Sequence, residues 1–450
     1  MIRRIASLHV VINIFLISIV ALGLFGCGGG TPESEEPETS GSGSVDADGH
    51  VTIEFWYSLG GDSGKVVEEL VKRFNESQSE ITVNGTYQGN YGAIMAKVWG
   101  AISAGSTPNV AQLGAAPLLG ETGTIAAVSD YMGGESGIDA SQIKDVFWQY
   151  NTAKGTIWTM PFNNSVPVMY YNKDLFAAAG LDPEKPPKTW DEVIEYGKQL
   201  TKDTDGNGEI DQWAFNTNDD THWFLSAMFL ENNAKIVDEA ETEVLYNSPE
   251  AVEMLTLWSD MITTHKIMPV NQHSEARGDF LAGKLAMLVG SSSGILSTER
   301  DATFKVGVAV IPTVAGKEPV APVGGASLVI FKHEQEVIQN ASWEFVKYMA
   351  SEESALYVAM NTGYLPIYNS ARENPDFIKY MEEHPNLNAT VLSLDYAYSI
   401  PEFSALGTSD TELRKAVQTV ELGQASPQDA LNAAKMAVDK FIKEQPQTQP

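Results

Sequence analysis

The sequence predicts an α/β protein with two lobes, and three observations support this prediction. Strand and helix patterns of apolar residues alternate over residues 51–113 in the order strand, helix, strand, helix, strand. The same alternation returns from residue 166 onward. About 400 residues have the amino-acid composition of a folded protein, and this is more than a single hydrophobic core usually contains. Two α/β lobes are therefore expected, the first with a largely parallel sheet.

The elements at the start of the folded part follow from their periodicity. Residues 51–57 alternate apolar and polar positions, as a half-buried strand does. Apolar residues at helical spacing over 66–74 predict a helix, and Ser63 is a plausible cap for it. The second strand, the second helix and the third strand are expected to follow at 81–83, 94–102 and 110–113.

The middle of the chain also alternates strand and helix patterns, with different residues at the turns. Prolines at 183–187 form a turn, and Thr189 then opens a helix. The carboxy-terminal third has helical spacing, and no internal repeat is visible. The other elements expected here are a short helix at 173–179 and apolar strands at 166–171, 285–289, 306–311 and 326–331.

The amino end has the pattern of a bacterial lipoprotein signal. Arg3 and Arg4 precede an apolar run over residues 5–26, and a small residue stands directly before Cys27. Such a run engages the export machinery, and the cysteine exposed by cleavage takes lipid. An uncleaved transmembrane anchor is the alternative, because the run is long enough to span a bilayer. Both interpretations place the remaining chain outside the cytoplasm.

The composition beyond Cys27 narrows the class of protein. Residues 28–49 are acidic and rich in glycine and serine, without aromatic residues, lysine or arginine, so we expect a disordered tether at 27–50. The formal net charge of −30 excludes a nucleic-acid partner, because binding a phosphate backbone requires clustered lysine and arginine. With its one cysteine used for lipid, the mature protein would have neither a disulfide nor a thiolate metal site.

Several segments carry a resemblance to a known family. The stretch from Met160 to Ser165, followed by 170–176, 179–181 and 186–190, resembles the signature of extracytoplasmic sugar-type solute-binding proteins of ABC importers. Three further stretches resemble the glycerol-3-phosphate-binding branch of that family, namely 87–91, 324–328 and 362–367. The resemblance covers the chain from residue 51 to about 442.

The resemblance implies the two-lobe periplasmic-binding-protein architecture, with a ligand cleft between the lobes. The protein would capture a sugar, a polyol phosphate or a glycerophosphodiester and deliver it to a membrane permease, with monomer as the default state. The implied divisions are a signal at 1–26, a tether at 27–50, a first lobe at 51–149 and 320–367, and a second lobe at 150–319 and 368–450.

The resemblance also implies a set of ligand contacts. The contacts of the branch fall on Tyr91, Ser165, Ser291, Gly325, Tyr364 and Arg414, and Arg414 would grip a phosphate. Tyr91 and Gly325 should come from the first lobe, Ser165 and Ser291 from the second, and Tyr364 from near a crossing. Where the branch has an acidic residue that holds glycerol hydroxyls, this chain has Ala115, which leaves the identity of the ligand open.

A binder of sugars or polyols also needs aromatic rings that cover C–H surface. Trp56, Trp190 and Trp223 are candidates for this role, with a place in the hydrophobic core as the alternative for each. Trp223 is preferred because its neighbours at 219–222 are polar.

An acidic loop after the helix that ends near Leu200 resembles the start of an EF-hand calcium loop. Oxygen-bearing side chains recur at alternate positions with Gly206 at the turn, but Ala214 stands where a bidentate glutamate belongs. The loop is therefore either a structural calcium site or a solvated turn, and no other cofactor is expected. The candidate ligands are Asp203, Asp205, Asn207, Glu209 and Asp211.

Two other function classes remain as alternatives. Residues 290–294 match the G-x-S-x-G nucleophile elbow, which would make Ser292 the nucleophile of a lipid-anchored hydrolase. The match is weak, because serine- and glycine-rich turns produce it by chance, and we expect a binding protein and no enzyme. A surface adhesin without a small ligand is the third class.

Overall fold

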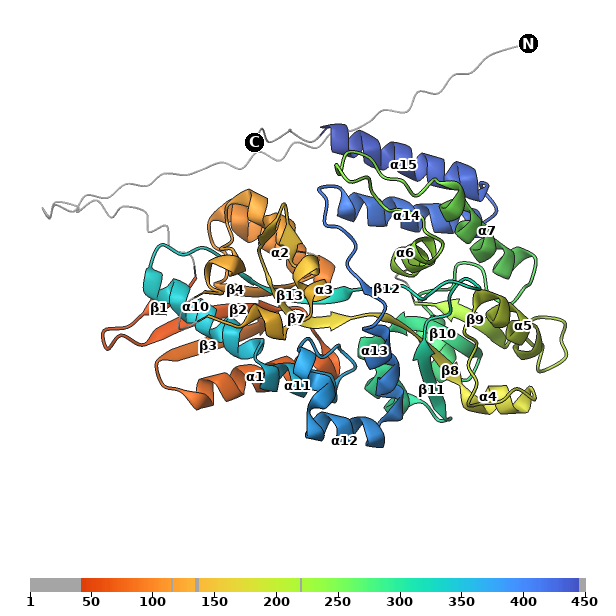
Figure 1. Ribbon diagram of the computed structural model, residues 1–450, viewed down its shortest axis with the longest axis horizontal. Helices are drawn as coiled ribbons and strands as arrows, with labels where there is room; N and C mark the ends of the chain where they lie inside the picture. Colours follow the sequence, from red (N-terminus) through yellow and green to blue (C-terminus); the bar gives the residue numbers. More distant parts are fainter. Residues whose placement is uncertain (1–41, 115, 134–136, 219–220, 445–450) are drawn as a thin grey trace, which may run out of the picture. The chain divides into compact units, whose positions relative to one another are not determined.

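The computed structural model describes residues 42–114, 116–133, 137–218 and 221–444. The segment Ser40–Pro450 forms one compact unit. Two main β-sheets and the helices around them make up this unit (Figure 1). Each sheet and its helices are called a lobe below.

The first sheet has the strand order β1-β2-β4-β13-β7, with β3 also paired to β2. β2 is parallel to β3 and β4, whereas β13 is antiparallel to β4 and β7. The expectation of a largely parallel sheet is therefore wrong, because β13 returns from the other lobe rather than through a βαβ crossover. The strands are β1 Ser44–Val45, β2 Val51–Tyr57, β3 Ile81–Tyr87, β4 Val110–Leu113, β7 Met160–Ser165 and β13 Gly324–Ile330.

The second sheet has four strands in the order β11-β8-β10-β9. β8 is antiparallel to both of its neighbours, and β10 is parallel to β9. The strands are β8 Pro167–Asn172, β9 Trp213–Thr217, β10 Leu285–Ser291 and β11 Val306–Val310, close to the sequence prediction.

Helices surround both sheets. In the first lobe they are α1 Gly61–Ser77, α2 Tyr91–Ala104, α3 Asp145–Tyr150, α10 Glu336–Met349 and α11 Glu352–Asn361. Those of the second lobe are α4 Lys173–Ala178, α5 Trp190–Leu200, α6 Thr221–Glu231, α7 Pro249–Thr263, α8 Ala276–Leu281, α9 Ile295–Asp301, α13 Asn388–Ser393, α14 Leu406–Glu421 and α15 Pro427–Glu444. α12, Pro375–Glu383, packs against α11.

Local sequence signals explain where several helices begin and end. Thr189 caps α5 with a capping box, since its side chain accepts from the N–H of Glu192 and the Glu192 carboxylate accepts from the N–H of Thr189. Gly105 ends α2 in the left-handed conformation, with a φ of 67°. α1 begins at Gly61, so the suggestion that Ser63 caps it is wrong, because Ser63 lies inside the first turn.

Three segments of the described chain pass between the lobes. Only Val166 separates β7 of the first sheet from β8 of the second. The chain returns between β11 and β13, and it passes over again between α11 and α14. The last two crossings pair with each other, because β12 (Ala321–Pro322) is parallel to β14 (Ala397–Tyr398).

The position of β7 differs from the expected lobe boundary. A boundary at residue 150 assigns residues 160–165 to the second lobe, yet they pair with β13 in the first sheet. β7 pairs with β13 on the side away from β4. Ser165 is therefore the last residue of a first-lobe strand and lies directly before the crossing.

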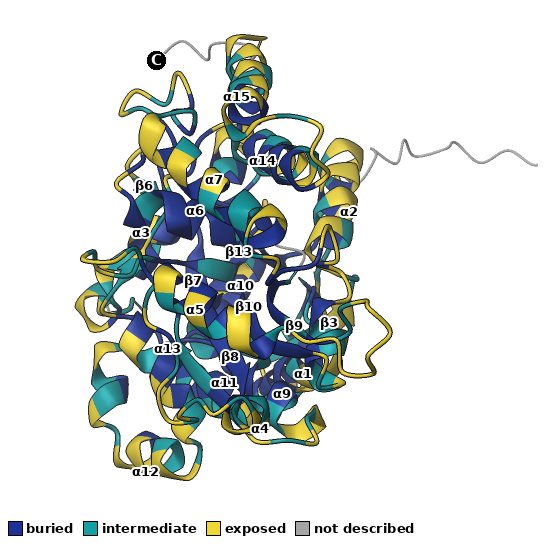
Figure 2. Ribbon diagram, turned by 90° about the vertical axis from the view of Figure 1, so that its right-hand side faces the viewer, coloured by how far each residue is buried: buried dark blue, intermediate teal, exposed yellow. Residues whose placement is uncertain are grey.

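Each lobe has an apolar interior. Buried residues, dark blue in Figure 2, follow the central strands. In the first lobe, Phe55 of β2 packs edge-on against Phe345 of α10, with ring centroids 5.1 Å apart. In the second lobe, Trp190 of α5 meets Phe215 of β9 in the same way at 6.0 Å. These packed sheets give the loops and helix ends between the lobes a rigid base.

The ordered chain begins before Val51. Residues 42–50 fall within the expected tether, yet β1 pairs with β2 and the Ser42 hydroxyl donates to the carbonyl of Thr107 at 2.5 Å. The Asp46 carboxylate accepts from two backbone N–H groups of the following turn. The predicted signal at 1–26 and Cys27 lie outside the described residues. Among the helices that the structure describes, none is long and apolar enough to cross a membrane.

Candidate functional site

A cavity of about 670 Å³ lies where the two lobes face each other. Strand ends and loops of the first lobe form one wall, and α6, α14 and the end of β10 form the other. Seven of the nine residues that the sequence analysis named as ligand contacts or covering rings line this cavity: Tyr91, Ser165, Trp223, Ser291, Gly325, Tyr364 and Arg414. Residues far apart in the sequence therefore meet at one concave surface.

A chain of buried hydrogen bonds positions the Tyr91 hydroxyl on the first-lobe wall. The Ser58 N–H donates to Gln112 Oε1 at 2.9 Å, and Gln112 Nε2 donates to Asn163 Oδ1 at 2.7 Å. Asn163 Nδ2 in turn donates to the Tyr91 hydroxyl at 3.2 Å. Gln112 and Asn163 are fully buried. This series of hydrogen bonds holds the Tyr91 hydroxyl in place, although 37% of the residue's surface is exposed.

Tyr364 extends this network toward the second lobe. Its hydroxyl is close enough to the side chains of Tyr91, Asn163 and Ser293 for hydrogen bonding to affect its pKa. Burial raises the pKa of Tyr364, and these three hydrogen bonds lower it in part. Burial of the hydroxyl end, rather than of the whole residue, likewise raises the pKa of Tyr91. Both tyrosines are therefore neutral hydroxyls that can donate to a ligand and accept from it.

Two adjacent glycines at the start of β13 allow two close approaches, one to β7 within the first lobe and one to the second lobe. Gly325 has a φ of +96°, and a Cβ there would lie 2.1 Å from the backbone oxygen of Asn163. A Cβ on Gly324 would lie 2.9 Å from the ring of Trp223, which belongs to α6 in the second lobe. The indole of Trp223 thus rests on first-lobe backbone that has no side chain.

The second-lobe wall is a group of polar and charged side chains from α6 and α14. Leu406, Asp410 and Arg414 recur every four residues and so present one face of α14 to the cavity. Arg414 Nη2 lies 3.2 Å from His222 Nδ1, and His222 Nε2 lies 3.8 Å from an Asp410 oxygen. Burial and then the positive charge of Arg414 lower the pKa of His222 to about 4, so the imidazole is neutral at pH 7.

Sequence reasoning missed several residues of this cavity, chiefly Tyr150, His222, Glu402 and Asp410. Tyr150, at the end of α3, donates a hydrogen bond to the Gly325 carbonyl at 3.3 Å. Glu402, just before α14, is 7% exposed. The four-residue spacing along α14 was a usable signal, but the sequence does not say which helix face meets the cleft.

Comparison with known proteins identifies the fold and the family. The family of bacterial extracellular solute-binding proteins matches residues 69–386. The chain belongs to this family. The predicted resemblance to solute-binding proteins of ABC importers is confirmed, and so is the prediction of a binding protein rather than an enzyme.

Curated relatives of this solute-binding protein include glycerol-3-phosphate-binding proteins. The sn-glycerol-3-phosphate-binding periplasmic protein UgpB of Salmonella typhimurium is 28% identical over 398 residues, which is 85% of this chain and 90% of that protein. UgpB of Escherichia coli K12 is 29% identical over 400 residues, with the same shares covered.

Solved structures give the same fold. UgpB of Mycobacterium tuberculosis in complex with glycerophosphocholine has a TM-score of 0.78 and 23% identity, covering 87% of this chain and 98% of that one. The maltose/maltodextrin-binding domain MalE of Bdellovibrio bacteriovorus bound to maltotriose has a TM-score of 0.75 and 21% identity, with 87% and 100% covered. The predicted two-lobe α/β architecture is confirmed.

Two tryptophan candidates lie elsewhere in the solute-binding protein. Trp190 is buried in the second-lobe core, and its Nε1 donates to Glu231 at 3.0 Å. Trp56 packs against the small hydrophobic cluster that includes residues of β4. Neither lines the cavity, because their strand and helix positions turn them toward core layers. Trp223 is the candidate that does, and Ala115 lies outside the described residues.

The acidic loop after α5 is closed by its own hydrogen bonds. The Asp203 carboxylate accepts from the N–H groups of Gly206, Asn207 and Gly208, and Asp211 accepts from Thr204. Within the described part of the chain, no group of three or more His, Cys, Asp or Glu side chains could hold a metal ion. A calcium ion in this loop stays a sequence-based prediction.

Ser292 is unsuited to nucleophilic attack. It is fully buried, and its Oγ accepts a 3.4 Å hydrogen bond from the N–H of Val166 at the crossing. Its neighbours Ser291 and Ser293 are the ones that line the cavity. The G-x-S-x-G match is a strand-to-helix turn of a solute-binding protein.

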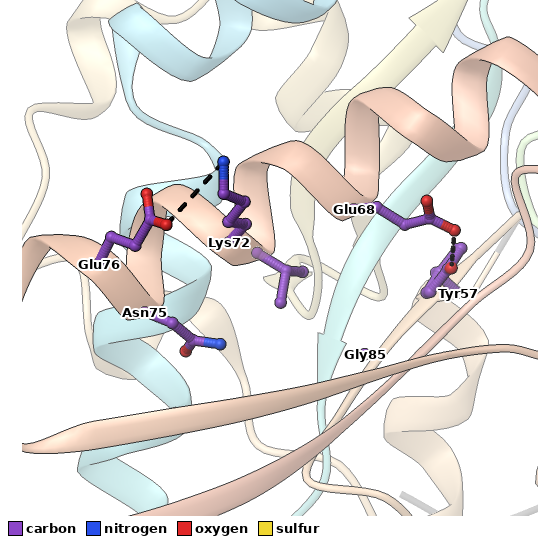
Figure 3. A pocket seen from close by; sticks show the side chains of 7 residues that line it. Tyr57, Glu68, Lys72, Asn75, Glu76 and Gly85 are labelled. Carbon is purple, nitrogen blue, oxygen red and sulfur yellow. Dashed lines mark hydrogen bonds and ion pairs between the residues drawn. The ribbon is translucent and has the colours of Figure 1, made fainter.

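A second hollow, of about 430 Å³, lies on the first lobe between α1 and β3 (Figure 3). Its polar groups are engaged with one another: the Tyr57 hydroxyl donates to Glu68 at 2.9 Å, and Lys72 lies 3.9 Å from Glu76. Both of its sides belong to the first lobe, so it lacks the two-lobe character of the larger cavity.

Proposed function

We propose that this chain captures a small polar solute in the cavity between its lobes and delivers it to the permease of an ABC importer. The solute is a sugar, a polyol phosphate or a glycerophosphodiester. Ligand would touch both walls and so favour the form in which the lobes are closed. The permease would then recognise that form.

The observation that supports the proposal most is the composition of the two facing walls. Tyr91, Tyr364 and Gly325 approach from one side, and Ser291 and Trp223 approach from the other. Hydroxyls and backbone groups can pair with ligand hydroxyls, while the indole can cover a C–H face. Such a set suits a polyhydroxylated molecule better than an apolar one.

We expect ligand binding to depend on Trp223. Full-length protein in detergent is titrated calorimetrically with maltotriose, glycerol-3-phosphate and glycerophosphocholine. At least one probe should bind, and it should stabilise the fold by about 2.7 kcal/mol at a hundredfold excess over its dissociation constant. Trp223→Ala should weaken that binding 10- to 100-fold, because the indole would no longer pack on the ligand.

Trp99 provides the matched control for this titration. It lies on α2, is 49% exposed and does not line the cavity. Trp99→Ala should therefore leave the affinity unchanged. Equal losses in both variants, or no heat from any probe, would count against a solute site at this cavity.

We further infer that Cys27 anchors the mature protein to the membrane through lipid. After fractionation of the producing cells, the parent protein should sediment with membranes. Cys27→Ala removes the lipid acceptor, so any exported protein that is cleaved should become soluble. A variant that stays in the membrane with its amino-terminal segment still attached would favour the uncleaved anchor instead.

A further inference from the structure

Glu402 is a buried acid on the cavity wall that the proposed contacts do not use. It is 7% exposed and lies in the crossing segment just before α14. Among the described residues, its Oε2 has no hydrogen-bond partner. Buried polar atoms are nearly always paired, so an unpaired carboxyl oxygen in a ligand cavity points to a partner that arrives with the ligand.

The groups around Glu402 carry more negative than positive charge. Asp410 of α14 and Glu241 of the loop after α6 act on its carboxyl, and both are acids. Arg414 also lines the cavity, but it contacts His222, which is neutral. A phosphate monoester in the cavity would meet the like charge of Asp410, and the one arginine of the lining, which also contacts His222, offsets that charge only in part.

We propose that Glu402 is a ligand-contacting residue that selects neutral, hydroxyl-bearing solutes over phosphate monoesters. This inference rests on the proposed function and narrows its substrate class. The resemblance implies an acidic ligand contact at the position of Ala115, and alanine cannot provide it. Glu402 supplies a carboxyl group to the cavity from a different segment.

The protonation of Glu402 fits this role. Burial, and then the charges of Asp410 and Glu241, raise the pKa of Glu402 to about 8. At pH 7 the group is therefore mostly a carboxylic acid, which both donates and accepts, as a sugar hydroxyl does. Above pH 8 it becomes a carboxylate that only accepts, so affinity for a neutral solute should fall as the pH rises.

The test compares maltotriose with glycerol-3-phosphate by calorimetry on full-length protein at pH 7 and pH 9.5. For the wild type we expect maltotriose to bind at pH 7 and to lose at least threefold in affinity at pH 9.5, with glycerol-3-phosphate weaker. Glu402→Gln keeps a donor and an acceptor but cannot ionise, so it should bind maltotriose equally at both pH values. Glu402→Leu should bind at least tenfold more weakly.

Glu231→Gln is the matched control. Burial also raises the pKa of Glu231 to about 8, but Glu231 lies in the second-lobe core beside Trp190 and does not line the cavity. Its variant should keep the affinity and the pH dependence of the wild type. Melting curves of all variants show whether each is folded before it is titrated.

The outcomes separate this inference from the proposed function. If glycerol-3-phosphate binds more tightly than maltotriose, or if Glu402→Gln and Glu402→Leu behave like the wild type at both pH values, the role of Glu402 is overturned while solute binding stands. If neither of these two probes nor glycerophosphocholine binds the wild type, both the inference and the proposed function fail.

Discussion

Gly325→Ala is expected to lower the free energy of unfolding by about 2–4 kcal/mol and to abolish ligand binding. The residue has a φ of +96°, which strains any side chain. The added Cβ would also lie 2.1 Å from the Asn163 backbone oxygen, which is part of β7 and cannot swing aside. β13 would have to move away from β7, and the cavity wall formed by both strands would change shape. Chemical denaturation and calorimetry measure the two effects.

Gly316→Ala separates backbone strain from steric overlap as the cause of the lost stability and the lost ligand binding. Gly316 also has a positive φ, +79°, but a Cβ there would meet no atom within 4 Å. The control should therefore cost about 1 kcal/mol, from backbone strain alone, and should leave ligand binding intact. If Gly325→Ala were as mild as Gly316→Ala, the close approach of β13 to β7 would not be required for the site.

Local patterns were sufficient to predict most strands of the two main sheets. The alternation over 51–57 became β2, and the apolar run at 285–289 became most of β10. Thr189 predicted the start of α5, because a helix cap such as its capping box with Glu192 is completed within four residues. These features depend on neighbours in the sequence, so the sequence alone reveals them.

Pairing between distant segments was harder to predict. Nothing local to residues 160–165 says that they pair with β13 of the first sheet rather than with β8. The error placed Ser165 in the wrong lobe, although it still lines the cavity, because the crossing at Val166 lies at the cleft. Family resemblance supplied the cavity residues that periodicity could not.

Glu402 shows why the rest of the site could not be predicted. It belongs to no motif, and it follows β14 in a short irregular segment. Its pKa is raised by its burial and then by the charges of Asp410 on α14 and Glu241 in a distant loop, which only the fold brings near it. A carboxyl group whose properties depend on distant neighbours leaves no pattern in the sequence.

Glu421→Ala is expected to destabilise the second lobe by about 3–5 kcal/mol, because it leaves buried donors without an acceptor. Glu421 is 4% exposed near the end of α14. Its Oε1 accepts from Trp258 Nε1 at 2.6 Å and pairs with His273 Nε2 at 2.9 Å, while Oε2 accepts from the Asn271 N–H at 3.0 Å. Thermal and chemical unfolding of the full-length variant measure the loss.

The same substitution should also weaken ligand binding, although Glu421 does not line the cavity. It ties α14 to α7 and to the segment that carries His273, and α14 presents Asp410 and Arg414 to the cavity. Glu412→Ala, on the same helix, removes only a pair with Lys415 and should cost about 0.5 kcal/mol without changing affinity. If Glu421→Ala destabilised the protein no more than Glu412→Ala does, α14 would not depend on this buried anchor, and the rigidity of the second-lobe wall would have to come from its packing against α15.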